Sequence, residues 1–91
     1  MIRVTAPWDP AFERVLRAHL PHFPAEASLQ ADQSLPAVGL DSVGMMRLLV
    51  ALEDGYGFAF PPEAVAPSTF RTPRTIWSVV SQWAGRSPAR R

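Results

Sequence analysis

The 91-residue chain contains no cysteine and no lysine, and its formal net charge is only +1. The absence of cysteine excludes disulfides, cysteine-ligated zinc and thiol catalysis, and we expect a reducing compartment, the cytoplasm. All nine basic residues are arginine, and eight acidic residues almost balance them. Such a balance argues against a strongly basic face, so we expect no nucleic-acid partner.

Long apolar runs are absent too, so we expect neither a membrane-spanning segment nor a signal peptide. A hydrophobic fraction of 47% is typical of a globular protein, and a chain of this length makes one domain, residues 1–91. Its ordered core should span about residues 9–84, followed by a flexible basic tail over 85–91. The chain begins with methionine and ends in that tail, so we expect a freestanding protein, and a monomer.

Three segments have the apolar spacing of helices. The first begins with Asp9 as N-cap and Pro10 at the first helical position, and prolines after residue 20 end it. The second runs from Ser42 to about residue 56, and the third begins at Pro73 after Thr72. Residues at i, i+3, i+4 and i+7 give each helix one buried face. These faces comprise Phe12, Val15, Leu16, His19 and Leu20; Met45, Leu48, Leu49, Leu52 and Tyr56; and Ile76, Val79, Val80 and Trp83.

Two connections complete the fold. Residues 21–40 form a long loop rich in proline, alanine and serine, which Leu29, Leu35 and Val38 are spaced to pin to the core. A short helical turn is expected near residues 67–71. The sequence therefore predicts an all-α bundle of four helices, three long and one short, with a long loop between the first two.

The stretch "GLDS" (39–42) places a serine at the head of the second helix, directly after the N-cap Asp41. A catalytic serine needs a positioned base, and Ser42 has no histidine, lysine or second acid near it in the sequence. It is therefore a candidate for modification rather than a nucleophile. Beside it, Gly44 should leave backbone open to a visiting molecule. His19 and His22 have a spacing that can hold a metal, but Pro21 separates them and one pair is not a site, so no metal is expected.

The "GLDS" motif, the "LEDGYGF" end of the second helix and the "FRTP" start of the last resemble the carrier proteins of fatty-acid, polyketide and nonribosomal-peptide synthesis. The resemblance covers residues 12–84. It implies a non-catalytic four-helix domain in which Ser42 receives 4′-phosphopantetheine from coenzyme A through a separate phosphopantetheinyl transferase. Asp41 would cap the helix and assist the transferase near its magnesium ion. The arm would then hold acyl or aminoacyl groups as thioesters for loading enzymes and for downstream condensing or tailoring enzymes.

The sequence departs from this family at the start of the second helix. Val43 stands where leucine is commonest, and the helix has only two acids, Glu53 and Asp54, near its end. Fatty-acid carriers display many acids there, so the resemblance is nearer to peptidyl or specialised polyketide carriers. We expect an apolar partner surface around Ser42, with an arginine at its edge, formed by Val43, Met46, Arg47 and Val50.

Two hypotheses compete with a modified carrier. One is a protein-interaction module that has the carrier fold but receives no prosthetic group. The other is an autonomous enzyme, which the sequence disfavours because no acid–base pair, metal set or phosphate-binding loop can be assembled from it.

Overall fold

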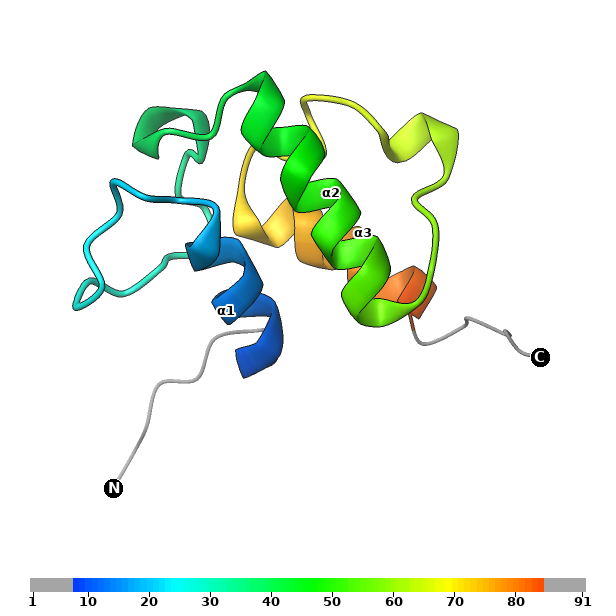
Figure 1. The fold of residues 1–91 in the computed structure, drawn as a ribbon, viewed down its shortest axis with the longest axis horizontal. Helices are drawn as coiled ribbons and strands as arrows, with labels where there is room; N and C mark the ends of the chain where they lie inside the picture. The colour runs from blue at the N-terminus through cyan, green and yellow to red at the C-terminus, as the bar shows by residue number, and fades with distance from the viewer. Residues whose placement is uncertain (1–7, 85–91) are drawn as a thin grey trace.

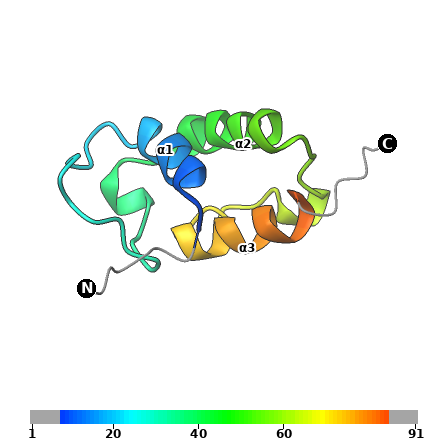
Figure 2. The ribbon, with the colours of Figure 1, turned by 90° about the horizontal axis from the view of Figure 1, so that it is seen from below.

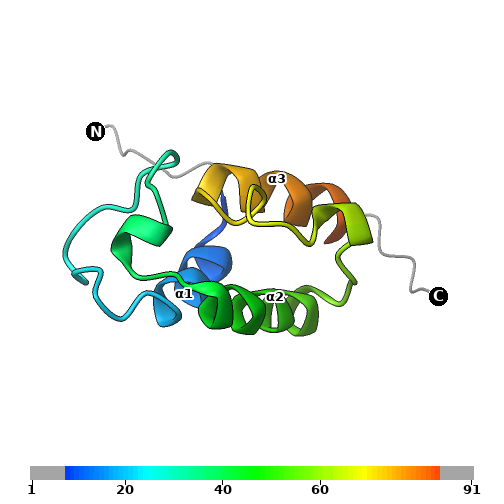
Figure 3. The same cartoon turned by 90° about the horizontal axis from the view of Figure 1, so that it is seen from above.

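The computed structural model describes residues 8–84, and within that range the protein is all-helical, with no strand. Three α-helices and two short 3₁₀ helices follow one another along the chain: α1 (Pro10–Ala18), η1 (Pro36–Val38), α2 (Ser42–Tyr56), η2 (Pro62–Ala64) and α3 (Pro73–Ala84). Helix α2 crosses the middle of the molecule (Figure 1). Seen edge-on, α1 and α2 lie in one layer, and α3 with the connection before it lies in the other (Figure 2, Figure 3). The predicted all-α class is confirmed.

Side-chain caps fix where the helices begin. Asp9 Oδ1 accepts a hydrogen bond from the backbone N–H of Phe12 at 2.8 Å, and Asp41 Oδ1 accepts one from the N–H of Gly44 at 2.8 Å. The Thr72 hydroxyl accepts from a backbone N–H of the first turn of α3 at 3.2 Å. Each cap satisfies a donor that the helix leaves unpaired, worth about 1 kcal/mol. The three predicted N-caps are therefore present.

Helix α2 ends as predicted, at a glycine in the left-handed conformation. Gly57 has φ 69° and ψ 42°, and its N–H donates to the carbonyl of Glu53 at 2.8 Å. The expected stop of the last helix at Gly85 and Pro88, and the arginine tail over 85–91, lie outside the described residues.

The short fourth helix expected near residues 67–71 is not confirmed. The chain there forms turns, in which the N–H of Phe70 donates to the carbonyl of Pro67 at 3.1 Å, and the short helix η2 lies earlier. Both turn bonds span three residues rather than the four of an α-helix, since the N–H of Thr69 likewise donates to the carbonyl of Ala66 at 3.0 Å. Pro73 has no N–H that could reach the carbonyl of Thr69. The Thr75 hydroxyl donates to that carbonyl instead, at 2.7 Å.

The core lies between the two layers. The fully buried aliphatic side chains of the α-helices come from all three, and the half-buried Met45, Tyr56 and Val79 pack at the core edge. Phe60 and Phe70, from the segment between α2 and α3, also lie in the core, with ring centroids 5.5 Å apart. The completely buried aliphatic residues on the helices are Leu16, Leu48, Leu52, Ile76 and Val80.

The loop over residues 21–40 is attached to two helices, α1 and α3. Arg17 donates to the carbonyl of Ala27 at 2.6 Å and forms an ion pair with Glu13 at 2.8 Å. Arg74 on α3 makes a bidentate pair with Asp32, at 2.8 and 3.0 Å. Leu29 and Leu35 are also buried, as predicted, so the loop is held on the core and the position of the chain at the start of α2 is fixed. Over residues 8–84, no helix combines the length and the apolar character needed to cross a bilayer.

Candidate functional site

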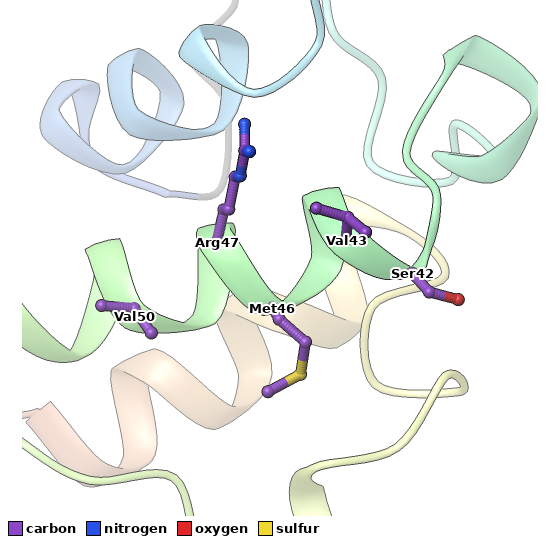
Figure 4. Close-up of a pocket in the computed structure, with 5 residues that line it drawn as sticks. All are labelled: Ser42, Val43, Met46, Arg47 and Val50. Carbon is purple, nitrogen blue, oxygen red and sulfur yellow. The ribbon is translucent and has the colours of Figure 1, made fainter.

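Ser42 is the first residue of α2, and its side chain is exposed. Figure 4 shows it pointing away from the helix at the first turn. Gly39 reverses the chain just before it with φ 107°, a left-handed conformation that favours glycine. Leu40 follows, 6% exposed and anchored by a 3.0 Å hydrogen bond from its N–H to the carbonyl of Leu35. The buried leucine and the Asp41 cap therefore hold Ser42 at the surface.

The first turn of α2 offers hydrogen-bond donors beside that hydroxyl. The Asp41 side chain accepts a hydrogen bond from the N–H of Gly44, and the Asp41 carbonyl accepts one from the N–H of Met45, at 2.8 Å each. The N–H groups of Ser42 and Val43 have no partner among residues 8–84. Free N–H groups and the positive end of the helix dipole favour an anion. An exposed hydroxyl next to them fits a phosphodiester, the linkage through which 4′-phosphopantetheine is held.

Gly44 has a different role from the one expected. A Cβ atom at this position would lie 3.2 Å from Asp41 Oδ1 and 3.2 Å from Leu40 Cδ1. The space beside the glycine is thus filled by the cap and by a core leucine, and it does not open backbone to a visitor. The missing side chain lets the capping carboxylate approach the helix closely.

No group able to activate the hydroxyl is paired with it. The Ser42 hydroxyl has no hydrogen-bond partner within residues 8–84, and no cluster there of three or more His, Asp or Glu side chains could hold a metal ion. His19 directs Nδ1 at the carbonyl of Val15, 2.9 Å away, and His22 is exposed. The chain can therefore present this hydroxyl, and no described side chain is hydrogen-bonded to it as a general base would be.

The exposed side of α2 is apolar. Val43, Met46 and Val50 are 60%, 46% and 51% exposed, whereas Leu48 and Leu52 on the opposite side are completely buried. Together with two polar neighbours they line an open hollow of about 610 Å³ (Figure 4). We call it the open face, and its residues are Ser42, Val43, Met46, Arg47 and Val50. The structure thus brings together on α2 the residues that the sequence singled out, with Asp41 as their cap.

The charged side chains of α2 lie apart, with a cation near Ser42 and two acids near the end of the helix. Arg47 is exposed and forms no ion pair within the described part of the chain. The two acids lie at the far end of the helix, about 16 Å from Ser42 along its axis. Glu53 accepts a hydrogen bond from the N–H of Phe60 at 2.8 Å, and Asp54 is exposed. The surface next to Ser42 on this helix therefore carries one cation and no anion other than the capping Asp41.

A second, more enclosed hollow of about 310 Å³ also borders Ser42. Its walls come from the turn before α2, the first turn of α2 and the turn before α3. We call it the side groove, and its residues are Pro36, Leu40, Asp41, Ser42, Met45, Pro67 and Phe70. Reasoning from sequence placed Met45 only in the core and missed Pro67 and Phe70, because no local pattern links them to a serine 25 or more residues earlier.

Comparison with known proteins identifies the domain. A family model described as "Phosphopantetheine attachment site" matches residues 12–77, well over half of the chain. A chain in the crystal structure of Bradyrhizobium japonicum glycine:[carrier protein] ligase complexed with glycylated carrier protein has a similar fold. The TM-score is 0.61 at 20% sequence identity, over 78% of this chain and 99% of that chain. No curated protein sequence matches. The chain belongs to the carrier-protein family defined by the phosphopantetheine attachment site, whose prosthetic group is covalently bound 4′-phosphopantetheine.

Proposed function

We propose that this chain carries acyl or aminoacyl intermediates of polyketide, nonribosomal-peptide or related specialised metabolism on a 4′-phosphopantetheine arm attached to Ser42. The observation that carries the proposal is the exposed Ser42 hydroxyl at the first turn of α2, inside the segment that matches the family. When bound, the arm supplies a thiol on which the intermediate is held as a thioester. The chain itself contains no cysteine, so every thiol would come with the arm.

Attachment needs a partner enzyme, a phosphopantetheinyl transferase. Ser42 Oγ forms a bond to the phosphorus that carries the pantetheine of coenzyme A, and the bond from that phosphorus to the adenosine bisphosphate breaks. The serine proton goes to a base of the transferase, because no described side chain is hydrogen-bonded to the hydroxyl. The free N–H groups of Ser42 and Val43 then stabilise the phosphodiester. Asp41 orders the first turn and, as in the resembling carriers, assists the transferase near its magnesium ion.

The test is the intact mass of the purified protein after incubation with coenzyme A and a broad-specificity phosphopantetheinyl transferase. The native chain should gain one phosphopantetheine, and Ser42→Ala should gain none while keeping its helical circular dichroism. Ser81→Ala, which removes another exposed serine, is the control and should be modified like the native chain. Addition to Ser42→Ala, or a folded native chain that stays unmodified, contradicts the proposal; the second result favours an unmodified interaction module.

We also place the docking of loading and downstream enzymes on the open face. Three exposed apolar side chains and an arginine that has no ion pair within residues 8–84 suit a partner surface that is mainly apolar, with a carboxylate opposite Arg47. The fold relative is glycylated and is bound to a ligase, so we extend to this chain the class of partner seen there, an enzyme that loads an aminoacyl group.

Two matched valines test this surface. Val50→Glu should slow loading by the host's loading enzyme without lowering thermal stability, because Val50 is already exposed. Val65→Glu makes the same change at a valine that is 41% exposed outside the open face, and it should load normally. Loading should also depend weakly on salt, because apolar contacts are not screened. Equal effects of the two substitutions, or a steep salt dependence, would place docking elsewhere.

A further inference from the structure

We propose that the phosphopantetheinyl transferase contacts His22, on the loop beside the attachment turn, and that the loading enzyme does not. The inference rests on attachment at Ser42, and it divides the surface around that residue between two classes of partner. The open face extends from Ser42 along α2. His22 belongs to the loop of residues 21–40 and lies against the turn that precedes Ser42.

The His22 ring packs on Gly39, three residues before Ser42. A Cβ atom at Gly39 would be 3.2 Å from His22 Cδ2 and 4.0 Å from Cγ, so the edge of the ring lies against the backbone of the turn. Both residues are exposed. Three residues span at most about 11 Å, so the ring edge is at most about 16 Å from the Cα atom of Ser42.

The reaction at Ser42 decides how much of this surface the transferase covers. The enzyme must bring a phosphorus atom to Ser42 Oγ, so its footprint is centred on that residue. A stable interface covers about 800 Å² per partner, which corresponds to a disc of about 16 Å radius, and His22 falls within such a disc. The loading enzyme acts on the thiol at the free end of the arm, so its footprint can lie to one side of Ser42, on the open face.

The backbone on both sides of His22 is held in place. The N–H of Phe23 donates to the carbonyl of Leu20 at 3.0 Å, and Leu20 is 2% exposed. The Arg17 guanidinium lies 5.2 Å from the centroid of the Phe23 ring and donates to the carbonyl of Pro24 at 3.3 Å. A side chain on a fixed backbone loses little conformational freedom on binding, so His22 is suited to contact a partner.

The ring nitrogens of His22 are available for that contact. Neither forms a hydrogen bond within residues 8–84, whereas Nδ1 of His19 is directed at a carbonyl of α1. An imidazole that is not charged donates through one nitrogen and accepts through the other. One hydrogen bond between neutral groups changes binding by about two- to tenfold.

The kinetics of attachment, measured with coenzyme A and the broad-specificity transferase, test the contact. His22→Ala and His22→Phe should each raise the KM for the protein about two- to tenfold and leave kcat unchanged, because both lose the ring nitrogens. Phenylalanine keeps a ring against Gly39, so native kinetics of His22→Phe would mean that the ring only supports the turn. Gln82→Ala, at an exposed position late in α3, is the control and should keep the native KM. All three variants should have the native Tm.

Loading tests the division between the two partners. Protein with His22→Ala that is modified to completion, as its intact mass shows, should be loaded by the host's loading enzyme at the native rate. An unchanged KM for attachment, a fall in kcat instead, or an equal loss in loading would overturn the inference while leaving attachment at Ser42 intact. If the native chain itself is not modified, the proposed function fails and this inference falls with it.

Discussion

Replacing Glu53 by alanine should destabilise the fold through one hydrogen bond. Glu53 Oε2 accepts from the backbone N–H of Phe60 at 2.8 Å and thereby ties α2 to the segment that follows it. Phe60 is 6% exposed and its ring packs on Phe70, so its N–H would lose its only acceptor among residues 8–84 in a place with little access to water. Hydrogen bonds to charged groups contribute about 1.5–3 kcal/mol, and because Glu53 is half-buried we expect a loss of about 1.5 kcal/mol. In a domain of this size that corresponds to a fall in Tm of about 6–12 °C.

The neighbouring acid is the control. Asp54 is exposed and has no recorded partner among residues 8–84, so Asp54→Ala should change the free energy of unfolding by about 0.5 kcal/mol or less. Glu53→Gln keeps an acceptor oxygen without the charge and should lie between the two. Urea unfolding followed by far-ultraviolet circular dichroism measures all three. Equal losses for Glu53→Ala and Asp54→Ala would show that the bond to Phe60 does not stabilise the fold, because both substitutions remove one negative charge and only Glu53→Ala removes that bond.

Four further substitutions test the core and its polar contacts. Leu48→Ala and Leu52→Ala each empty a completely buried site and should cost about 2–5 kcal/mol, so an unchanged urea midpoint would mean that the buried face of α2 is wrongly assigned. Burial and a 2.8 Å hydrogen bond to Asp9 raise the pKa of Tyr56 above its usual 10.0. The Tyr56 hydroxyl therefore contributes its full stabilisation below pH 10, and this contribution is lost as the pH rises further. Above pH 10 the Tm of Tyr56→Phe should fall less than the Tm of the native protein. Parallel curves of Tm against pH for the two proteins would contradict this. A lysine at position 17 cannot reproduce the guanidinium fork that donates to the loop carbonyls. In Arg17→Lys, amide hydrogen exchange over residues 21–28 should therefore accelerate while the amides of α2 stay protected. Unchanged exchange over residues 21–28 would argue against an anchoring role for Arg17.

The helix boundaries could be predicted because they depend on neighbours in the sequence. The caps at Asp9, Asp41 and Thr72 each bond a residue three positions later, and Gly57 meets a local demand for positive φ. The apolar period likewise assigned the buried leucines of α2 correctly, since burial on a helix repeats with its turn. The local geometry around Ser42 follows from these same short-range rules.

Contacts between distant segments could not be predicted in the same way. The bond from Phe60 to Glu53 and the ion pair of Asp32 with Arg74 depend on how loops return to the helices. Phe70 lies in a segment without apolar period and nonetheless completes both the core and the side groove. The role of Gly44 could not be predicted either, because the atoms that a Cβ at this position would crowd are known only from the folded structure.

Every proposed role of this protein depends on attachment of the arm to Ser42 in the cell. The most direct measurement is tandem mass spectrometry of the protein purified from its own host without added transferase. We expect phosphopantetheine on the peptide that contains Ser42, with an acyl or aminoacyl group on the thiol in part of the sample. A purified, folded protein whose Ser42 is wholly unmodified, or one that carries the arm on another residue, would contradict it.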